Sequence, residues 1–101
     1  RPHPTILGLD CEMVLTSTGK HELARVTLLR LTPTPTNPES TTVLYDSLVV
    51  PRHPVRNYLT KYSGITAKLL KGVTTRLEDV QATLVTIVCK DDVLVGHSME
   101  N

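Results

Sequence analysis

Phe and Trp are absent from this sequence and Tyr occurs only three times, so a core must be built from Leu, Val and Ile. The chain has no apolar run long enough to span a bilayer, which predicts no membrane partner. Two cysteines, Cys11 and Cys89, are too few for a disulfide framework, and we expect them to be reduced core residues of an intracellular protein. A secretory signal and an initial Met are missing, so we interpret the 101 residues as one segment of a longer protein.

Acidic residues are missing between Asp46 and Glu78, although the net charge of the chain is only +1. Clustered cations favour a polyanionic partner, because such a partner neutralises their repulsion. The alternative is a solvated surface whose basic side chains point in different directions. The acid-free stretch holds six of the eleven Lys and Arg residues: Arg52, Arg56, Lys61, Lys68, Lys71 and Arg76.

Two carboxylates, Asp10 and Glu12, follow the apolar run Thr5–Leu9. Alternate side chains of a strand point to the same face, so both acids leave the strand on one side, roughly 7 Å apart. A cation between them relieves their repulsion, and Mg²⁺ or Mn²⁺ prefers oxygen ligands of this kind. The pair indicates metal-assisted chemistry, with an ordinary solvated strand end as the alternative. Cys11 points to the opposite face, and we interpret it as a core residue and not as a metal ligand.

The first half of the chain predicts three strands and no helix. Thr5–Cys11, Glu22–Leu31 and Val43–Val50 are apolar stretches of strand length, with a turn predicted over Leu15–Lys20. The segment Thr32–Thr42 contains three prolines and is predicted to be an exposed loop between two strands of an antiparallel meander.

The second half predicts helices followed by a fourth strand. Thr66 is a predicted N-cap for a short helix over Ala67–Lys71, which Gly72 ends. Thr75–Glu78 matches a capping box, with Glu78 at the third helical position, and apolar residues then recur at helical spacing to about Cys89. Val93–Gly96 is predicted to enter the sheet parallel to the first strand, because a helix precedes it. The fold class is therefore α/β: three antiparallel strands, helices, then a parallel strand.

Four stretches resemble one family in the right order. Leu9–Val14 (LDCEMV) is similar to the first motif of the DEDDh 3′-to-5′ exonucleases, and more narrowly of their RNA exonuclease branch. Leu23–Leu28 resembles that branch's second strand, and Tyr58–Thr66 resembles its Y-x-T-x-x-S-G-[IV]-T segment. Leu94–Asn101 resembles the approach to the second exonuclease motif. The resemblance implies that residues 1–101 are the N-terminal portion of a single exonuclease domain with a ribonuclease-H-like sheet, cut before its C-terminal helices.

The resemblance implies hydrolysis of RNA from a single-stranded 3′ end with two Mg²⁺ or Mn²⁺ ions. Asp10 would bridge both ions, and Glu12 would hold the ion that activates water. The family's two remaining carboxylates and its general-base His would follow Asn101, and His97 does not occupy the place of that base. We therefore expect the 101-residue piece alone to be inactive or nearly so.

Further substrate-binding residues follow from the same resemblance. Met13 and Val14 would contact the terminal nucleotide, with simple packing of Met13 as the alternative. Lys61 and Ser63 would meet phosphates, unless their segment is only a turn before the Thr66 cap. His97 would lie beside the carboxylates and orient a group there by a hydrogen bond.

Two other function classes compete with the enzyme. One is a non-catalytic RNA-binding module that keeps the fold, and the other is an interaction scaffold that binds no nucleic acid. Retention of both Asp10 and Glu12 argues against an inactive parent, because an adjacent charge pair costs stability without a metal. The resemblance also implies a nuclear or nucleolar location, and it leaves open whether DNA is accepted.

Overall fold

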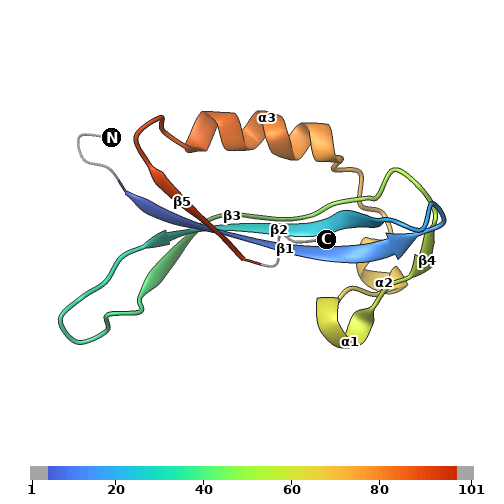
Figure 1. Cartoon of the computed structure of the whole chain (residues 1–101), viewed down its shortest axis with the longest axis horizontal. Helices are drawn as coiled ribbons and strands as arrows, with labels where there is room; N and C mark the ends of the chain where they lie inside the picture. Colours follow the sequence, from blue (N-terminus) through green and yellow to red (C-terminus); the bar gives the residue numbers. More distant parts are fainter. Residues whose placement is uncertain (1–4, 98–101) are drawn as a thin grey trace.

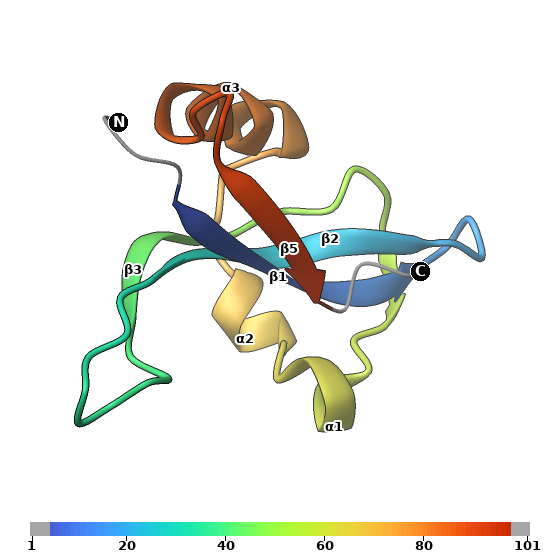
Figure 2. The ribbon, with the colours of Figure 1, turned by 60° about the vertical axis from the view of Figure 1, so that its left-hand side comes forward.

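The computed structural model describes residues 5–97, in which a β-sheet lies beneath one long helix (Figure 1). Figure 2 shows two short helices on the other side of the sheet. The elements in chain order are β1 (Ile6–Thr16), β2 (His21–Leu31), β3 (Thr41–Leu48), β4 (Val55–Asn57), α1 (Thr60–Ser63), α2 (Ala67–Leu70), α3 (Leu77–Ile87) and β5 (Val93–His97).

Strand β1 is the centre of the sheet and has neighbours along both edges. On one edge β1 pairs with β2, and β2 pairs with β3, both in antiparallel. On the other edge the first five residues of β1, Ile6–Asp10, pair in parallel with β5. The last two residues of β1 pair in antiparallel with the short strand β4. Residues 11–14 of β1 lie between these two partners, so among residues 5–97 their only strand neighbour is β2.

The structure corrects the predicted length of the first strand. A strand ending at Cys11 was expected, with a turn starting at Leu15, but β1 continues to Thr16. The side chains of Val14 and Thr16 are fully buried, so the alternation of inward and outward residues continues past the carboxylates. The turn is confined to residues 17–20, where Gly19 has a φ of 82° and the Thr16 amide donates to the carbonyl of Lys20. Asp10 and Glu12 therefore lie in the middle of β1 and not at its end.

The predicted third strand is displaced towards the N-terminus. Val43–Val50 was expected, whereas β3 spans Thr41–Leu48. A bulge explains where β3 stops: Glu12 pairs with Arg25 and Met13 with Leu23, so Ala24 is an extra residue in β2. The amide of Val49 bonds to the carbonyl of Ala24 at this bulge, outside the regular ladder.

Two apolar clusters stabilise the two faces of the sheet. The first, which we call the α3-side core, consists of Leu7, Leu9, Cys11, Val26, Leu28, Val49 and Val80. The second, the α2-side core, consists of Val14, Ala24 and Ile65, with Tyr58 and Leu70 packed against it. Burial of Cys11 confirms its interpretation as a core residue.

The helix ends follow the predicted capping only in part. Thr66 is confirmed as the N-cap of α2, because its Oγ1 accepts a hydrogen bond of 3.1 Å from the amide of Leu69. The capping box predicted for Glu78 is wrong by one residue. The carboxylate of Asp79, not that of Glu78, accepts a hydrogen bond of 2.8 Å from the amide of Arg76, which is the N-cap of α3. Helix α3 ends at Ile87, two residues before the predicted end. No helix within residues 5–97 has the length and apolarity that a membrane-spanning helix requires.

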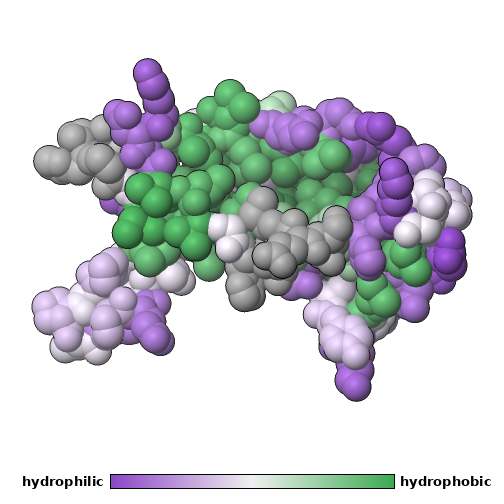
Figure 3. Space-filling view, in the orientation of Figure 1, coloured by the Kyte–Doolittle hydropathy of each residue, from purple (hydrophilic) through white to green (hydrophobic). Residues whose placement is uncertain are grey.

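Apolar side chains gather at the end of the sheet where β1 begins. Figure 3 shows this apolar surface on the left of the molecule, over the beginning of β1 and over β5. Ile6, Val43, Val93 and Val95 are each about half exposed, at 47–59% of their surface. The described part of the chain therefore leaves this end of the sheet uncovered, in contrast to the face beneath α3.

Replacing Val80 by Ala should lower the free energy of unfolding by about 2 kcal/mol, because two buried methyl groups are lost and a cavity is left. Val80 is 2% exposed and attaches α3 to the sheet. Val85→Ala on the same helix is the matched control, since Val85 is 80% exposed. Its effect should stay within about 0.5 kcal/mol. Denaturant unfolding followed by circular dichroism measures both, and equal effects would contradict the assigned packing of α3.

Candidate carboxylate site on the central strand

Asp10 and Glu12 lie on the face of β1 that is opposite to the α3-side core. Leu7, Leu9 and Cys11 point into that core, so the two carboxylates between and beyond them point to the α2 side. Both residues are half-buried. The buried residues Leu7, Leu9 and Cys11 thus determine the face to which Asp10 and Glu12 point, because turning the strand over would expose these apolar side chains to water.

One carboxylate oxygen of Asp10 lacks a hydrogen-bond donor. Oδ1 of Asp10 is buried and has no hydrogen-bond partner within residues 5–97. A buried acceptor without a donor costs free energy, and a divalent cation is a partner that such an oxygen would satisfy. The donor set of two carboxylates fits a hard ion such as Mg²⁺ or Mn²⁺. Within residues 5–97 there is no cluster of three or more potential metal ligands, so the pair is at most part of a metal site.

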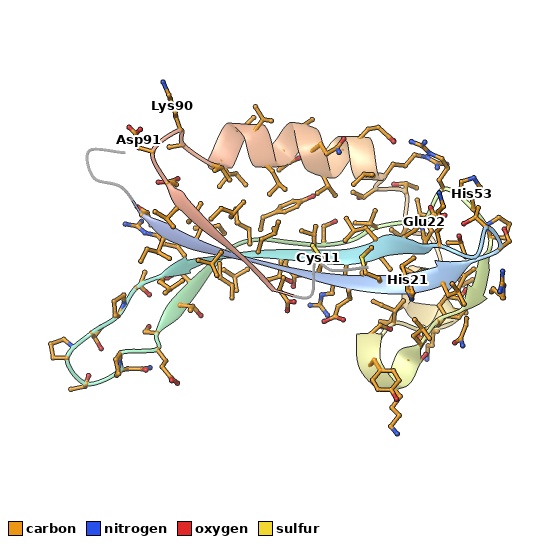
Figure 4. The ribbon with its side chains drawn as sticks, viewed as in Figure 1. Cys11, His21, Glu22, His53, Lys90 and Asp91 are labelled. Atoms are coloured by element: carbon orange, nitrogen blue, oxygen red, sulfur yellow. The ribbon has the colours of Figure 1, made fainter. Side chains whose placement is uncertain are left out.

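The thiol of Cys11 does not take part in this pair. Figure 4 shows Cys11 on the side of β1 that faces α3. Burial raises the pKa of the Cys11 thiol, and the negative charges of Asp10 and Glu12 raise it further. The thiol is therefore protonated at neutral pH, which makes it a poor metal ligand.

Three more polar residues share the face of the carboxylates. In the sheet Arg25 pairs with Glu12, Thr27 pairs with Asp10, and Asp46 of β3 pairs with Thr27. Directly opposite residues of paired strands point to the same face, so these side chains form a polar row across three strands.

The residues of this row are joined by charge-assisted hydrogen bonds. The guanidinium of Arg25 donates to both oxygens of Asp46, with Nε–Oδ1 and Nη2–Oδ2 distances of 3.0 and 2.7 Å. The hydroxyl of Thr27 donates to Oδ1 of Asp46 at 3.0 Å. The hydrogen bonds from Arg25 hold the pKa of Asp46 below its usual value. Those bonds to Asp46 also raise the pKa of Arg25, with a smaller contribution from Glu12 and Asp10.

Sequence reasoning missed this row. The available signal was the spacing of Arg25 and Thr27, two polar residues at alternate positions of an apolar strand. Asp46 could be connected to them only through the register of β3, which the sequence did not fix.

The structure places the predicted nucleotide contacts in different environments. Val14 is fully buried in the α2-side core, and Met13 is half-buried against the α3-side core. The main chain of His97 pairs with that of Asp10, and the side chain of His97 lies outside the described residues. The roles assigned to these three residues stay predictions.

Lys61 and Ser63 both lie in α1. The Nζ atom of Lys61 lies 5.8 Å from the centre of the Tyr62 ring, and both side chains are exposed. The hydroxyl of Ser63 donates to the carbonyl of Tyr58 and accepts from the amide of Ile65, at 2.8 and 2.9 Å. These bonds organise the turn before α2 and occupy the Ser63 hydroxyl. Of the two interpretations of Ser63, a phosphate contact or a turn residue, these hydrogen bonds favour the turn residue.

The acid-free stretch lines an open groove beside α2. The groove has a volume of about 760 Å³, and four of its lining residues are Arg52, His53, Lys68 and Lys71. No Asp or Glu lines it within residues 5–97. Helix α2 packs on the α2-side core, which is on the same side of the sheet as Asp10 and Glu12.

A second groove, of about 520 Å³, lies on the α3 side and differs in its charges. Two carboxylates, Glu22 and Glu78, line it among several cations. Glu22 accepts hydrogen bonds of 2.8 Å from His53 and from the amide of Arg52 (Figure 4). Burial raises the pKa of Glu22, but these hydrogen bonds outweigh it and hold the value below the usual one. Arg52 also pairs with Glu78, so the charges of this groove are mostly neutralised by each other.

Comparison with known proteins gives several relatives that share nearly the whole chain. No protein-family model matches it. It is 44% identical over 99 residues to an uncharacterized exonuclease of Schizosaccharomyces pombe, covering 98% of this chain and 14% of that protein. It is 45% identical over 95 residues to human RNA exonuclease 5, covering 94% of this chain and 11% of that protein. The identity to RNA exonuclease 1 of Saccharomyces cerevisiae is 40% over 97 residues, or 95% of this chain and 16% of that protein.

The chain thus spans only 11–16% of the length of these three relatives. The matched regions cover 94–98% of this chain. The family resemblance found in the motifs is confirmed: nearly the whole chain is homologous to one segment of the RNA exonucleases.

Proposed function

We propose that the protein containing this chain is a metal-dependent 3′-to-5′ exoribonuclease, and that residues 1–101 are the N-terminal portion of its catalytic domain. The observation that carries the proposal is the carboxylate pair of β1, where Oδ1 of Asp10 is buried without a donor among the described residues. The pair lies in a chain with relatives named RNA exonuclease. The first three strands form an antiparallel meander, helices follow β4, and β5 then pairs in parallel with β1; this arrangement supports a ribonuclease-H-like fold for that domain.

Asp10 and Glu12 would together hold divalent cations, Mg²⁺ or Mn²⁺. When bound, two such ions supply activation of a water molecule and stabilisation of the leaving 3′-oxygen. The chain's own contribution is to fix the two carboxylates on one face of a strand that is hydrogen-bonded on both edges near Asp10. Because Val14 is fully buried, a contact of the Met13–Val14 segment with the terminal nucleotide would come from its main chain or from the exposed part of Met13.

His97 would lie next to the pair, since its main chain is the neighbour of Asp10 in β5. We assign it the role of orienting a group at the site, not that of a metal ligand. Lys61, exposed on α1, would contact a phosphate of the RNA. The substrate would be the single-stranded 3′ end of an RNA, with DNA as a second candidate, and the location would be the nucleus or nucleolus.

Replacing Asp10 by Asn in the full-length protein should lower nucleotide release by more than about 100-fold, because even residues that only orient a metal ligand cost about 10–100-fold. The fold should persist, since the change removes a half-buried charge and keeps the volume of the side chain. Release of nucleoside monophosphate from a 3′-labelled RNA measures the loss. Removal of metal with EDTA should abolish the activity of the unchanged protein.

Asp91→Asn is the matched control, since Asp91 is exposed in the turn before β5 (Figure 4). It should leave nucleotide release unchanged. Normal release by the Asp10 variant would remove the basis of the proposed site.

The groove beside α2 also favours RNA binding, whether or not the protein is catalytic. Lys68 and Lys71 contribute two positive charges to a surface without carboxylates among its lining residues. A phosphate chain would displace counterions from this surface, so its binding must weaken as salt rises.

The double variant Lys68→Gln with Lys71→Gln should bind single-stranded RNA more weakly and with a smaller salt dependence. Each lost phosphate contact should reduce the slope of log affinity against log salt by about 0.7. Filter binding of the full-length protein in EDTA measures the slope without cleavage. The control Lys90→Gln removes an exposed charge beside β5 and should not change the slope. A slope unaltered by the double variant would exclude the groove as an RNA contact. RNA binding without any nucleotide release by the unchanged protein would favour the non-catalytic module.

A further inference from the structure

Arg25 has two acidic neighbours in the sheet, Glu12 and Asp46. On β1 its direct partner in the sheet is Glu12; on β3 its direct partner is Leu48, and Asp46, the partner of Thr27, is its diagonal neighbour. The side chains of Arg25, Glu12 and Asp46 point to the same face, and neighbouring strands are about 4.8 Å apart. A long, flexible side chain in this position could direct its guanidinium to either strand.

The guanidinium is directed to β3. Its two side-chain hydrogen bonds within residues 5–97 both go to Asp46, in a two-pronged geometry that fixes the plane of the guanidinium. The hydroxyl of Thr27 gives Asp46 a third hydrogen bond and fixes that carboxylate in turn. On the opposite side of Thr27 in the sheet lies Asp10, whose buried Oδ1 receives no hydrogen bond from a described residue.

The stability of the protein does not explain this arrangement. The side chains of Arg25 and Asp46 are 46% and 37% exposed. Ion pairs at such exposure contribute about 0–1 kcal/mol. The arrangement of charges on this face is more informative. The Arg25 guanidinium lies near Asp10 and Glu12, the two acids that would hold a divalent ion, but it is bound by a third acid, Asp46.

We infer that Asp46 restrains Arg25 and thereby keeps its guanidinium away from the carboxylates of Asp10 and Glu12, which would hold a divalent cation. The inference rests on the proposed metal-dependent function. If Asp46 were neutral, the guanidinium would turn to its other neighbour, Glu12, and compete with the metal ion for carboxylate oxygens. Asp46 and Arg25 are positioning residues in this arrangement, and neither touches the reacting atoms.

The test is a double-mutant cycle in the full-length protein, with Mn²⁺ affinity from titration calorimetry as the readout. Asp46→Asn should weaken Mn²⁺ binding by about tenfold, the size of effect seen for residues that support metal ligands. Adding Arg25→Gln to that variant should restore the affinity to within about threefold of the unchanged protein. Arg25→Gln alone should change the affinity by less than about threefold, because Asp46 already restrains the guanidinium; the two changes are therefore not additive.

Long-range electrostatics alone would give a different result. In that case Arg25→Gln would raise Mn²⁺ affinity by the same factor whether residue 46 is Asp or Asn, and the inference would be overturned. Arg30→Gln removes an exposed charge from the same strand and Glu39→Gln removes one from the 32–40 loop. These two controls measure the effect of net charge, and they should not show the coupling.

The cycle also separates this inference from the proposed function. If the unchanged protein binds no Mn²⁺, or if Asp10→Asn binds it equally well, the metal site is wrong and the inference falls with it. If Asp10→Asn abolishes binding but Asp46→Asn does not weaken it, only the role of Asp46 is wrong. Should Asp46→Asn fail to fold, as judged by circular dichroism, Thr27→Val replaces it. That variant removes one hydrogen bond to Asp46 and should also weaken Mn²⁺ binding. Adding Arg25→Gln to it should restore the Mn²⁺ affinity.

Discussion

The alternation of β1 between two environments is the constraint on which the candidate site depends. Leu7, Leu9 and Cys11 are held in the α3-side core, so the residues that alternate with them must point to the opposite face of the sheet. The carboxylates point away from the core because their neighbours cannot leave it. Pairing with β2 along one edge and with β5 along the other prevents the strand from slipping, since a shift of one residue would exchange the two faces.

The bulge in β2 allows one sheet to serve two cores. Residues 25–30 of β2 pair with β1 in a regular register. The extra residue Ala24, which precedes them in the chain, changes the face to which the β2 side chains point. Val26 and Leu28 therefore pack towards α3, whereas Ala24 packs with Val14 and Ile65 towards α2. Arg25 lies at this point of change, and it joins the face of the acids. Arg25 is the last residue of the regular register before the bulge, so its pairing with Glu12, and not the bulge itself, places it on the face of the carboxylates.

Periodicity in the sequence identified what is local, and it failed where distant segments decide the outcome. The presence of β1, β2, β3 and β5, the Thr66 cap and the core position of Cys11 follow from spacing and residue type alone. The extension of β1 to Thr16 depends on pairing with β4, which lies about 40 residues away along the chain, and the three-residue strand β4 is too short to leave a pattern. Thr75–Glu78 fits the capping-box pattern by residue type and Arg76–Asp79 does not, so the sequence pattern placed the start of α3 one residue too early.

The same limit applies to the candidate site. The spacing of Asp10 and Glu12 was sufficient to place both acids on one face, because that inference needs only the geometry of a single strand. The relation of Arg25 to Asp46 could not be predicted, because it needs the registers of two strand pairs and the position of a bulge.

The half-exposed Ile6, Val43, Val93 and Val95 have a thermodynamic consequence for any segment that comes to lie on them. Each 100 Å² of apolar surface removed from water there would contribute about 2.5 kcal/mol, a large amount beside the marginal stability of a small fold. Whichever part of the polypeptide, or of another molecule, covers that end of the sheet would also shield the hydrogen bonds between β5 and the first half of β1 from water, and so make the strand that carries Asp10 and Glu12 more rigid.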